Sequence, residues 1–303
     1  MKYPPILLVL ISHPAQAAAV PFFAGDGAGS ERTQKTLPAA AEGAVVIENV
    51  SGQIRVEVSD RAEVSLDARV DCGADRLTFE REGDRTRVRV KSDGDRRCGG
   101  ADLALIVPRK SRLEVQTTSA EIDLRGVSGG VRIQTVSGDV ALDQVSGGVS
   151  IMSVSAELQL KLAGGDVETQ SVSGDAEISL GTGTGAVRVK SVSGDIAVEA
   201  QALTAVRVQT VSGDIRLKGG VGDRGPFTVE SQSGDIALQL PDATRAQLRL
   251  ETFSGQLDSS VKGEETSSRR GHGPGEKRQI ALGSGGPEVA LTTFSGDIRV
   301  GLY

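Results

Sequence analysis

The residues best suited to chemistry in this 303-residue chain are carboxylates that recur in a Ser-Gly-Asp triplet. The triplet and its variants return every 18 to 21 residues along most of the chain. If the copies stack in register, one edge of the molecule carries six aspartates: Asp139, Asp175, Asp195, Asp214, Asp235 and Asp297. Variant copies hold Gln53, Glu121, Glu157 and Gln256 at the same position. Such a row of oxygen ligands is suited to Ca²⁺ or to a cationic ligand.

A structural role is the alternative for the same aspartates, and we favour it. Ser and Asp side chains bond to nearby backbone in turns, and Gly adopts the positive φ that tight turns need. A Ca²⁺ site requires about six to eight oxygens that converge on one point. The sequence also lacks the nonapeptide pattern of calcium-binding β-rolls. Closely stacked carboxylates would repel one another and titrate as a coupled set.

Other chemistry finds little support in the residues. One of the two histidines, His13, lies in a predicted targeting segment, and His272 lies in a Gly-rich stretch, so no serine has a well-placed base. A ladder of equivalent carboxylates singles out no acid–base pair for glycoside hydrolysis. Gly181–Gly185 is not followed by the Lys-Ser/Thr of a phosphate-binding loop. We therefore predict a protein that is not an enzyme and that has no cofactor or metal.

Nucleic acid is also an unpromising partner for this chain. The formal net charge is −6, and aromatic residues make up 3% of the sequence. Nucleic-acid binding generally requires a basic surface, often with aromatic side chains for base stacking.

The elements that position the carboxylates belong to a longer repeated phrase, VRIQTVSGD at Val131–Asp139. Its serine recurs at positions 119, 137, 155, 173, 193, 212, 233, 254 and 295. Within one period, Val131–Gly148, apolar and polar residues alternate on both sides of the triplet, which is typical of two half-buried strands. No segment between turns has the length or the period of a helix. A regular repeat of this kind indicates a stacked architecture.

We therefore predict an all-β fold, a parallel β-solenoid (β-helix) with coils of 18–21 residues and two short strands per coil. One such unit cannot bury enough apolar surface alone, so neighbouring coils must share hydrogen bonds and a core. Equivalent residues then stack about 4.8 Å apart. The first internal column consists of Val131, Val149, Val167, Val187 and Val206. The 39 Gly and the absence of Trp agree with a thin interior and many tight turns.

The first 17 residues predict an export signal. Lys2 is followed by the apolar run Ile6–Ile11 and by Ala15-Gln16-Ala17, which has the A-x-A form of a cleavage site. The mature chain would begin at Ala18 and would be periplasmic or secreted. The apolar run is shorter than the ~20 residues that span a bilayer, so stable membrane insertion is not expected after cleavage.

The remaining regions follow from composition. Residues 18–43 lack periodicity and predict a flexible leader, and residues 44–112 predict an irregular β cap at the N-terminal end of the solenoid. Cys72 and Cys98, the only cysteines, predict a disulfide in that cap; a metal pair or a catalytic thiol is the alternative. The solenoid itself is expected over residues 113–303.

The last part of the solenoid departs from the regular repeat. A polar, Gly-rich stretch at 259–275 predicts an inserted surface loop. Val289–Val300 reads as the last coil, and its free edge suggests end-to-end self-association or a partner.

The repeated phrase, together with LALIVP at Leu103–Pro108 and LEV at Leu113–Val115, resembles the DUF4097 family of adhesin-like bacterial proteins. The resemblance spans roughly Ala44 to Val300. It implies a β-solenoid of short stacked strands, and it transfers no catalytic residues. Similar domains, called toast-rack domains, occur in envelope-stress proteins.

Three functions are compatible with these observations. The one we favour is an exported, non-enzymatic, adhesin-like scaffold or binding module of the bacterial cell envelope, which binds an envelope protein or a glycan. A carbohydrate-active β-helix enzyme, either a polysaccharide lyase or a hydrolase, is the alternative, although such enzymes have longer coils and more binding loops. An envelope-stress sensor domain is the third.

Overall fold

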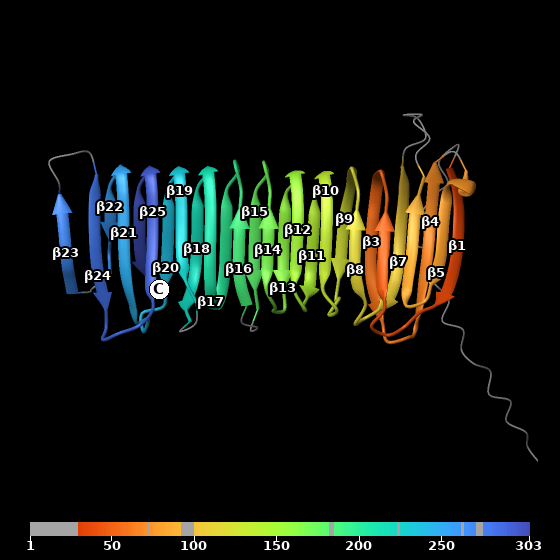
Figure 1. Ribbon diagram of the computed structural model, residues 1–303, viewed down its shortest axis with the longest axis horizontal. Helices are drawn as coiled ribbons and strands as arrows, with labels where there is room; N and C mark the ends of the chain where they lie inside the picture. The colour runs from red at the N-terminus through yellow and green to blue at the C-terminus, as the bar shows by residue number, and fades with distance from the viewer. Residues whose placement is uncertain are drawn as a thin grey trace, which may run out of the picture.

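The computed structural model describes residues 30–71, 73–91, 100–181, 185–222, 225–261, 264–270 and 275–303. These residues form an elongated solenoid of two facing β-layers (Figure 1), with a single 3-10 turn, η1 (Ala74–Arg76). Among the residues that the structure describes, no helix has the length and hydropathy that crossing a bilayer requires. The predicted export signal lies outside the described residues.

The chain passes between the two layers at the corners of the coils, and one long strand, β17, continues unbroken from one layer into the other. Layer A contains, in spatial order, β5 (Leu77–Glu82), β6 (Arg85–Val90), β2 (Ala44–Glu48), β8 (Arg112–Gln116), β10 (Val131–Ser137), β12 (Val149–Ser155), β14 (Val167–Gln170), β16 (Gly185–Lys190), the second half of β17 (Ile196–Ser212), β19 (Phe227–Ser233), β25 (Glu288–Ser295), β21 (Ala246–Ser254), β24 (Glu276–Leu282) and β23 (Glu264–Arg270). Layer B contains β1 (Ser30–Pro38), β4 (Glu63–Asp71), β7 (Ala101–Pro108), β3 (Ser51–Ser59), β9 (Ser119–Arg125), β11 (Val140–Val145), β13 (Leu158–Leu162), β15 (Ala176–Leu180), the first half of β17, β18 (Ile215–Val221), β20 (Ile236–Leu240), β26 (Ile298–Leu302) and β22 (Leu257–Ser259).

Parallel pairing in a constant register holds the repeated coils together, as the sequence predicts. In layer A, Val131 pairs with Val149 and Ile133 with Ile151, and the same register continues through β14, β16 and β17. In the repeated strands such as β10 and β12, the inward side chains are buried, while the side chains between them are mostly exposed. Burial of each apolar column between the layers supplies the favourable free energy that one coil lacks. The prediction of a parallel β-solenoid is confirmed.

A third inward column is polar and closes each coil at its corner. Thr135 is buried, and its Oγ1 donates to the carbonyl of Ser137 at 2.7 Å. Ser171 and Ser191 donate in the same way to the carbonyls two residues ahead, at 2.8 Å and 2.9 Å. The hydroxyl therefore satisfies a carbonyl at the point where the chain leaves layer A, which explains why Thr or Ser recurs before the Val-Ser-Gly-Asp corner.

The last coil in the sequence is not the last coil in space. Strand β25 pairs with β19 on one side and with β21 on the other, and β26 lies in the same way between β20 and β22. Figure 1 shows β25 between β19 and β21. The expectation of a free edge along Val289–Val300 is therefore wrong, because this coil has a hydrogen-bonded neighbour on both sides.

The N-terminal end is interleaved in the same manner. Strand β2 pairs in parallel with β6 and with β8, and β3 pairs in parallel with β7 and with β9. The predicted cap thus contains a coil in full register with the repeats, since Ile47 pairs with Val115 and Ile54 with Ile122. Both interleaved coils are held from two sides, which opposes fraying of a stack near its ends.

Antiparallel strands extend the parallel stack at its two ends. In layer B, β4 runs antiparallel to β7 and β1 antiparallel to β4, while β5 is antiparallel to β6 in layer A. At the other end, β24 is antiparallel to β21 and β23 antiparallel to β24. Two predictions are corrected here: residues 30–38 of the supposed leader form β1, and residues 264–270 of the supposed loop at 259–275 form β23. In both cases cross-strand pairing imposes strand structure on a polar segment without hydrophobic alternation.

The interleaving predicts an unusually large effect of Leu291→Ala. Leu291 is fully buried and lies between Val229 and Leu250 on the neighbouring strands. We expect a loss of about 2–5 kcal/mol in the free energy of unfolding, because a cavity forms in the middle of the stack. Urea denaturation followed by circular dichroism measures it, with the exposed Thr292→Ala on the same strand as control. Equal effects of the two changes would contradict the interleaved position of β25.

Candidate binding surface at the repeat corner and on layer A

The Val-Ser-Gly-Asp corner, or a variant of it such as the Val-Ser-Ala-Glu of Val154–Glu157, turns the chain from layer A to layer B in the regular coils. Gly138 has φ of 98°, and a Cβ on it would lie 2.4 Å from the carbonyl oxygen of Ala120 in the preceding coil. Position 138 therefore requires glycine, whereas the equivalent position in two other coils is held by the buried Ala120 and Ala156. The serines of the phrase lie in register, as in the pairs Ser137–Ser155 and Ser212–Ser233.

The six predicted aspartates lie along this corner, and five of them are joined into a ladder of hydrogen bonds. The backbone N–H of Asp195 donates to Oδ1 of Asp175 at 2.8 Å, and the N–H of Asp214 donates to Oδ1 of Asp195 at 2.9 Å. The same bond links Asp235 to Asp214 and Asp297 to Asp235, and Gln256 closes the series on Asp297. Each carboxylate thus caps the backbone of the adjacent coil, whereas the sequence suggested a bond within its own turn.

Two arginines of layer B form ion pairs with four carboxylates of this ladder and offset half of their charge. Arg216 bridges Asp195 and Asp214 at 3.1 Å and 3.2 Å, and Arg299 bridges Asp235 and Asp297 at 2.9 Å each. Both oxygens of these four carboxylates are therefore engaged, Oδ1 by a backbone N–H and Oδ2 by a guanidinium.

The same contacts change the ionisation of two ladder carboxylates. The backbone N–H of Asp214, with Arg216 beside it, lowers the pKa of Asp195 below its ordinary value. The backbone N–H of Asp297, with Arg299, lowers the pKa of Asp235. Both carboxylates are stabilised in their charged form by donors that the fold itself provides.

The acidic row does not gather into a metal-binding arrangement in the part of the chain that the structure describes. No group of three or more His, Cys, Asp or Glu side chains there is placed to hold a metal ion. A ladder distributes its oxygens along a line, whereas Ca²⁺ needs them around one point. Cys72, Cys98 and His272 lie outside the described residues, so the predicted disulfide stays a prediction.

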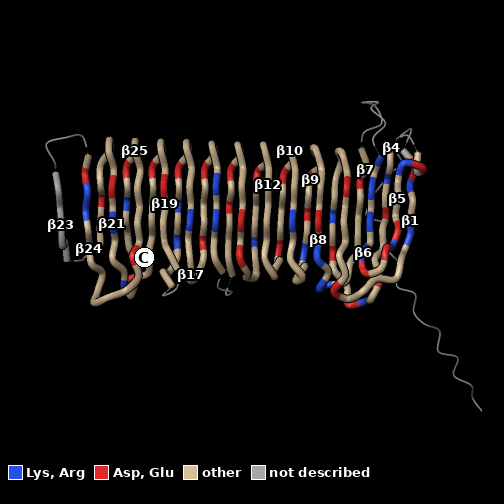
Figure 2. Tube along the Cα trace, in the orientation of Figure 1, with Lys and Arg blue, Asp and Glu red and all other residues tan. Residues whose placement is uncertain are grey.

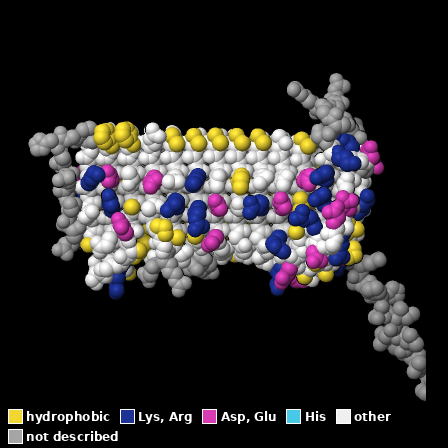
Figure 3. All heavy atoms as spheres, viewed as in Figure 1, with side chains coloured by type: hydrophobic (Ala, Val, Ile, Leu, Met, Phe, Trp, Pro, Cys, Tyr) yellow, Lys and Arg dark blue, Asp and Glu magenta, His cyan; other side chains and the backbone are white. Residues whose placement is uncertain are grey.

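An exposed apolar row beside the corner was missed by the sequence reasoning. We call it the apolar ridge, and it consists of Val136, Val154, Val172, Val192, Val211, Phe294 and Phe253, each 45–55% exposed. Figure 3 shows hydrophobic side chains along this edge of the molecule. The repeated VRIQTVSGD phrase did contain an indication of the ridge. Side chains alternate between the two faces of a strand, so an inward Thr135 requires the next side chain, Val136, to point outward.

Interleaving of the C-terminal coil brings the two phenylalanines of the ridge together. Phe253 and Phe294 are far apart in the sequence, but β25 lies beside β21, and Ser254 pairs with Ser295. Their rings stack with centroids 4.7 Å apart and planes inclined by 9°. The result is an aromatic end to a row that is otherwise aliphatic.

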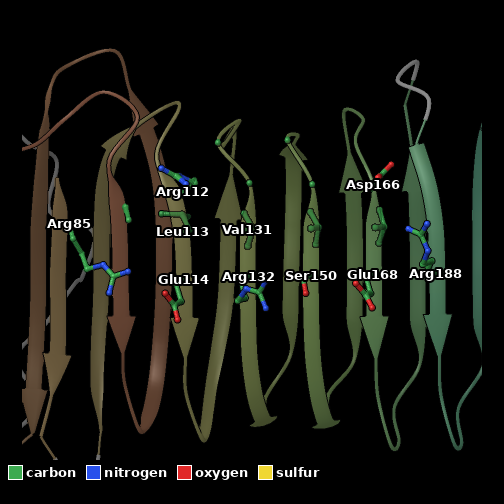
Figure 4. Close-up of a pocket in the computed structure, with 17 residues that line it drawn as sticks. Arg85, Arg112, Leu113, Glu114, Val131, Arg132, Ser150, Asp166, Glu168 and Arg188 are labelled. Atoms are coloured by element: carbon green, nitrogen blue, oxygen red, sulfur yellow. The ribbon is translucent and has the colours of Figure 1, made fainter.

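A shallow trough crosses the opposite margin of layer A, where the Gly-rich turns enter the strands (Figure 4). Its volume is about 650 Å³. Glycines form part of its wall, since a Cβ on Gly147 would lie 2.3 Å from the carbonyl oxygen of Ser128. The charged and polar side chains that line it are Arg85, Arg112, Glu114, Arg132, Ser150, Asp166, Glu168 and Arg188.

Charged side chains of the trough stand side by side on successive strands (Figure 4). Glu114 is in register with Arg132 and Glu168 with Arg188, but the two glutamates accept hydrogen bonds from Gln116 and Gln170. Within the described part of the chain, Arg132 and Arg188 form no ion pair shorter than 4.0 Å. Figure 2 shows that acidic and basic positions are interspersed along the length of the molecule. Arg132 and Arg188 are exposed and present their donors to solvent.

Comparison with known proteins identifies a family and several solved structures. The Toastrack DUF4097 family matches residues 106–301. A candidate adhesin from Bacteroides fragilis is similar at 13% identity and a TM-score of 0.41, with 89% of this chain and 97% of that chain covered. A candidate lipid-binding protein from Parabacteroides distasonis is similar at 14% identity and a TM-score of 0.40, with 89% and 96% covered. A candidate adhesin from Parabacteroides merdae has 11% identity, a TM-score of 0.30, and 90% and 96% coverage. No curated protein matches the chain.

The lowered pKa values of Asp195 and Asp235 predict an acid-sensitive contribution to stability. A carboxylate whose pKa falls on folding stabilises the protein above its unfolded pKa of about 3.9 and loses that effect as the pH drops through the folded value. Both side chains are more than a third exposed, so each should contribute no more than about 1 kcal/mol. We expect Asp235→Asn to lower the melting temperature at pH 7 and to reduce the difference between pH 7 and pH 3. The control is Asp143→Asn in layer B; an equal response of the two variants would refute the role of the ladder.

The engaged oxygens of the ladder also predict that Ca²⁺ does not bind there. Isothermal titration calorimetry with millimolar CaCl₂ should give no binding heat, because four carboxylates already have partners on both oxygens. Saturable binding that disappears in Asp195→Asn would restore the cation hypothesis.

Proposed function

Because the chain belongs to the Toastrack DUF4097 family, we propose that it is a non-enzymatic, adhesin-like binding module of the bacterial cell envelope. The outward side chains of layer A form its recognition surface. The predicted export signal at residues 1–17 supports an envelope location. The rigid solenoid serves as a scaffold that holds this surface flat over many coils.

The trough of layer A is the observation on which this proposal rests. Arg85, Arg112, Arg132 and Arg188 line it, and their guanidinium groups are the donors best matched to carboxylate and phosphate groups. The strands beneath hold these side chains in fixed rows, so little backbone freedom is lost on binding. The partner that fits is an envelope glycan that bears carboxylates or phosphates, laid across several coils.

The variation between coils is consistent with recognition. The first outward row of layer A, most of which lines the trough, varies from β8 to β17, while the first inward column is aliphatic in the same strands. The outward row reads Glu114, Arg132, Ser150, Glu168, Arg188 and Arg207. The short Ser150 leaves a gap between longer neighbours (Figure 4). A ligand can therefore contact charged groups on both sides of this gap.

Binding to an acidic polysaccharide tests the proposal. We expect the mature protein to bind polygalacturonate more tightly than neutral dextran, with an affinity that falls as salt is added. The double variant Arg132→Gln/Arg188→Gln should bind at least about tenfold more weakly, because charge-assisted hydrogen bonds contribute roughly 1.5–3 kcal/mol each. Surface-immobilised polysaccharide and biolayer interferometry provide the measurement.

The matched control removes two positive charges elsewhere. Arg61→Gln/Arg125→Gln alters exposed arginines outside the trough, each paired with a neighbouring carboxylate. Equal losses in the two double variants would mean that net charge and not the trough governs binding. A reducing-sugar assay on the same polysaccharides distinguishes a binding module from an enzyme, and turnover there would overturn the proposal.

A further inference from the structure

Nearly all of the exposed large hydrophobic side chains in the described part of the chain lie in one line. Nine such side chains are exposed, and seven of them form the apolar ridge. The ridge follows the ends of β10, β12, β14, β16, β17, β25 and β21, and it is interrupted once, at β19, where Gln232 takes the equivalent position. Scattered exposed apolar residues need no explanation, but a continuous row of them marks an interaction surface.

The coil fold does not require this row to be apolar. The corner needs the hydroxyl before the ridge residue, which donates within its own coil, and the serine after it, which donates to the preceding coil. The glycine beyond allows the close approach of the preceding coil. The ridge residue itself points outward from the end of each layer A strand. Thr118 and Gln232 occupy the same position in other coils, so polar side chains are accommodated there.

We propose that the apolar ridge is the surface through which a second copy of this chain binds. The two ridges lie side by side with the same direction, related by a two-fold axis parallel to the ridge, and each ridge residue faces its own equivalent. This contact is isologous, as in most symmetric dimers.

The spacing of the ridge favours a second copy over an irregular partner. Neighbouring ridge residues lie about 4.8 Å apart, so the whole row extends over roughly 34 Å. A surface that presents side chains at the same interval over the same length is available on another β-solenoid, and a second copy presents an identical one. Side chains at equal intervals can then meet their equivalents pair by pair along the full length.

Charge complementarity favours the parallel arrangement. On one flank of the ridge, the outward row two residues earlier contains the donors Gln134, Gln170, Lys190 and Gln209 in four coils and Met152, Glu230, Thr292 and Glu251 in the other four. The carboxylates of Glu230 and Glu251 already have partners within the chain, Gln209 and Lys277. On the other flank lies the carboxylate ladder, with Asp139, Asp175, Asp195 and Asp214 in the four coils that carry the donors. A two-fold axis along the ridge places the amide and ammonium donors of one copy opposite the carboxylates of the other. An antiparallel arrangement would instead bring the two carboxylate ladders together.

The area of contact sets the expected affinity. Half-exposed valines and phenylalanines give roughly 300–550 Å² of apolar contact per copy. A standard interface buries about 800 Å² per partner, so the flanking polar rows must also contribute. The dimer should therefore be weak, in the micromolar range. The stacked pair Phe253–Phe294 would meet its equivalent across the axis and form the aromatic anchor of the interface.

Sedimentation velocity on the mature chain tests the proposal. Between about 1 and 200 µM, the range in which interfaces of this size associate, we expect a concentration-dependent monomer–dimer equilibrium. Val172→Lys/Val192→Lys should shift the equilibrium to monomer by at least tenfold in the dissociation constant, because like charges then face each other. Val172→Thr/Val192→Thr keeps the β-branched shape and should weaken the dimer less.

The control Ala141→Lys/Ala197→Lys adds the same charge on the opposite layer, in β11 and β17. It should leave the dimer unchanged. A chain that stays monomeric at all concentrations overturns the proposal, and so does a dimer that the ridge variants do not weaken.

Flotation with phosphatidylcholine vesicles completes the test: ridge-dependent binding of a monomer to vesicles would identify a lipid surface as the occupant instead. Polygalacturonate binding measured on the lysine variants separates this inference from the proposed function, because the trough lies at the other margin of layer A.

Cysteine cross-linking tests the direction of the two chains. In the parallel arrangement, Val136→Cys and Val211→Cys each face their own equivalents, so each variant alone should form an oxidised dimer on a non-reducing gel. In an antiparallel arrangement Val136 lies opposite a distant ridge residue. Cross-linking that requires a mixture of the two variants would overturn the parallel two-fold arrangement.

Discussion

The parallel hydrogen-bonded register between successive coils is the constraint on which the whole molecule depends. Once Val131 pairs with Val149, the register determines for all remaining residues of the two strands whether the side chain points into the core or toward solvent. The aliphatic columns, the hydroxyl column, the apolar ridge and the carboxylate ladder are therefore consequences of a single alignment. A shift by one residue in any coil would move its valines to solvent and its polar side chains into the core, so the register is strongly specified.

The corner shows how this register makes an acidic row tolerable. Like charges at the spacing of adjacent strands are unfavourable, yet the ladder places Asp175, Asp195 and Asp214 on successive coils. Each carboxylate gains a backbone N–H from the next coil, and Arg216 and Arg299 each form ion pairs with two of them. The donors that lower the pKa of Asp195 and Asp235 are the same donors that hold the coils together. These hydrogen bonds and ion pairs offset the repulsion between the carboxylates and also join successive coils.

The structure of a single coil could be predicted from the sequence, but the order in which the coils stack could not. Alternation and the Ser-Gly-Asp corners predict the strands, the parallel pairing and the stacked aspartates, because these follow from local periodicity. The positions of β2–β3 and β25–β26 between other coils could not be predicted, since every coil offers its neighbours an equivalent face. For the same reason the stacking of Phe253 on Phe294 was invisible in the sequence. The strand at Glu264–Arg270 was missed because pairing with β24, and not hydrophobic alternation, determines it.

The trough and the ridge occupy opposite margins of one layer, and the fold gives them different properties for the same reason. The turns that lead into the strands of layer A are rich in glycine. Because glycine has no side chain, this margin of the layer forms a shallow trough in which the arginines of the first outward row are exposed. Strands leave the layer at the hydroxyl column, where the backbone must turn and the last outward side chain stands at the edge. The shallow polar trough at one margin is suited to a charged ligand that stays partly hydrated when it binds. An apolar row at the other is suited to a partner that removes water from it. A dimer that buries the ridge along its length would leave both troughs open, so two copies could present a doubled recognition surface to one extended polymer. The avidity of such a pair exceeds that of a single trough without any additional contact to the polymer.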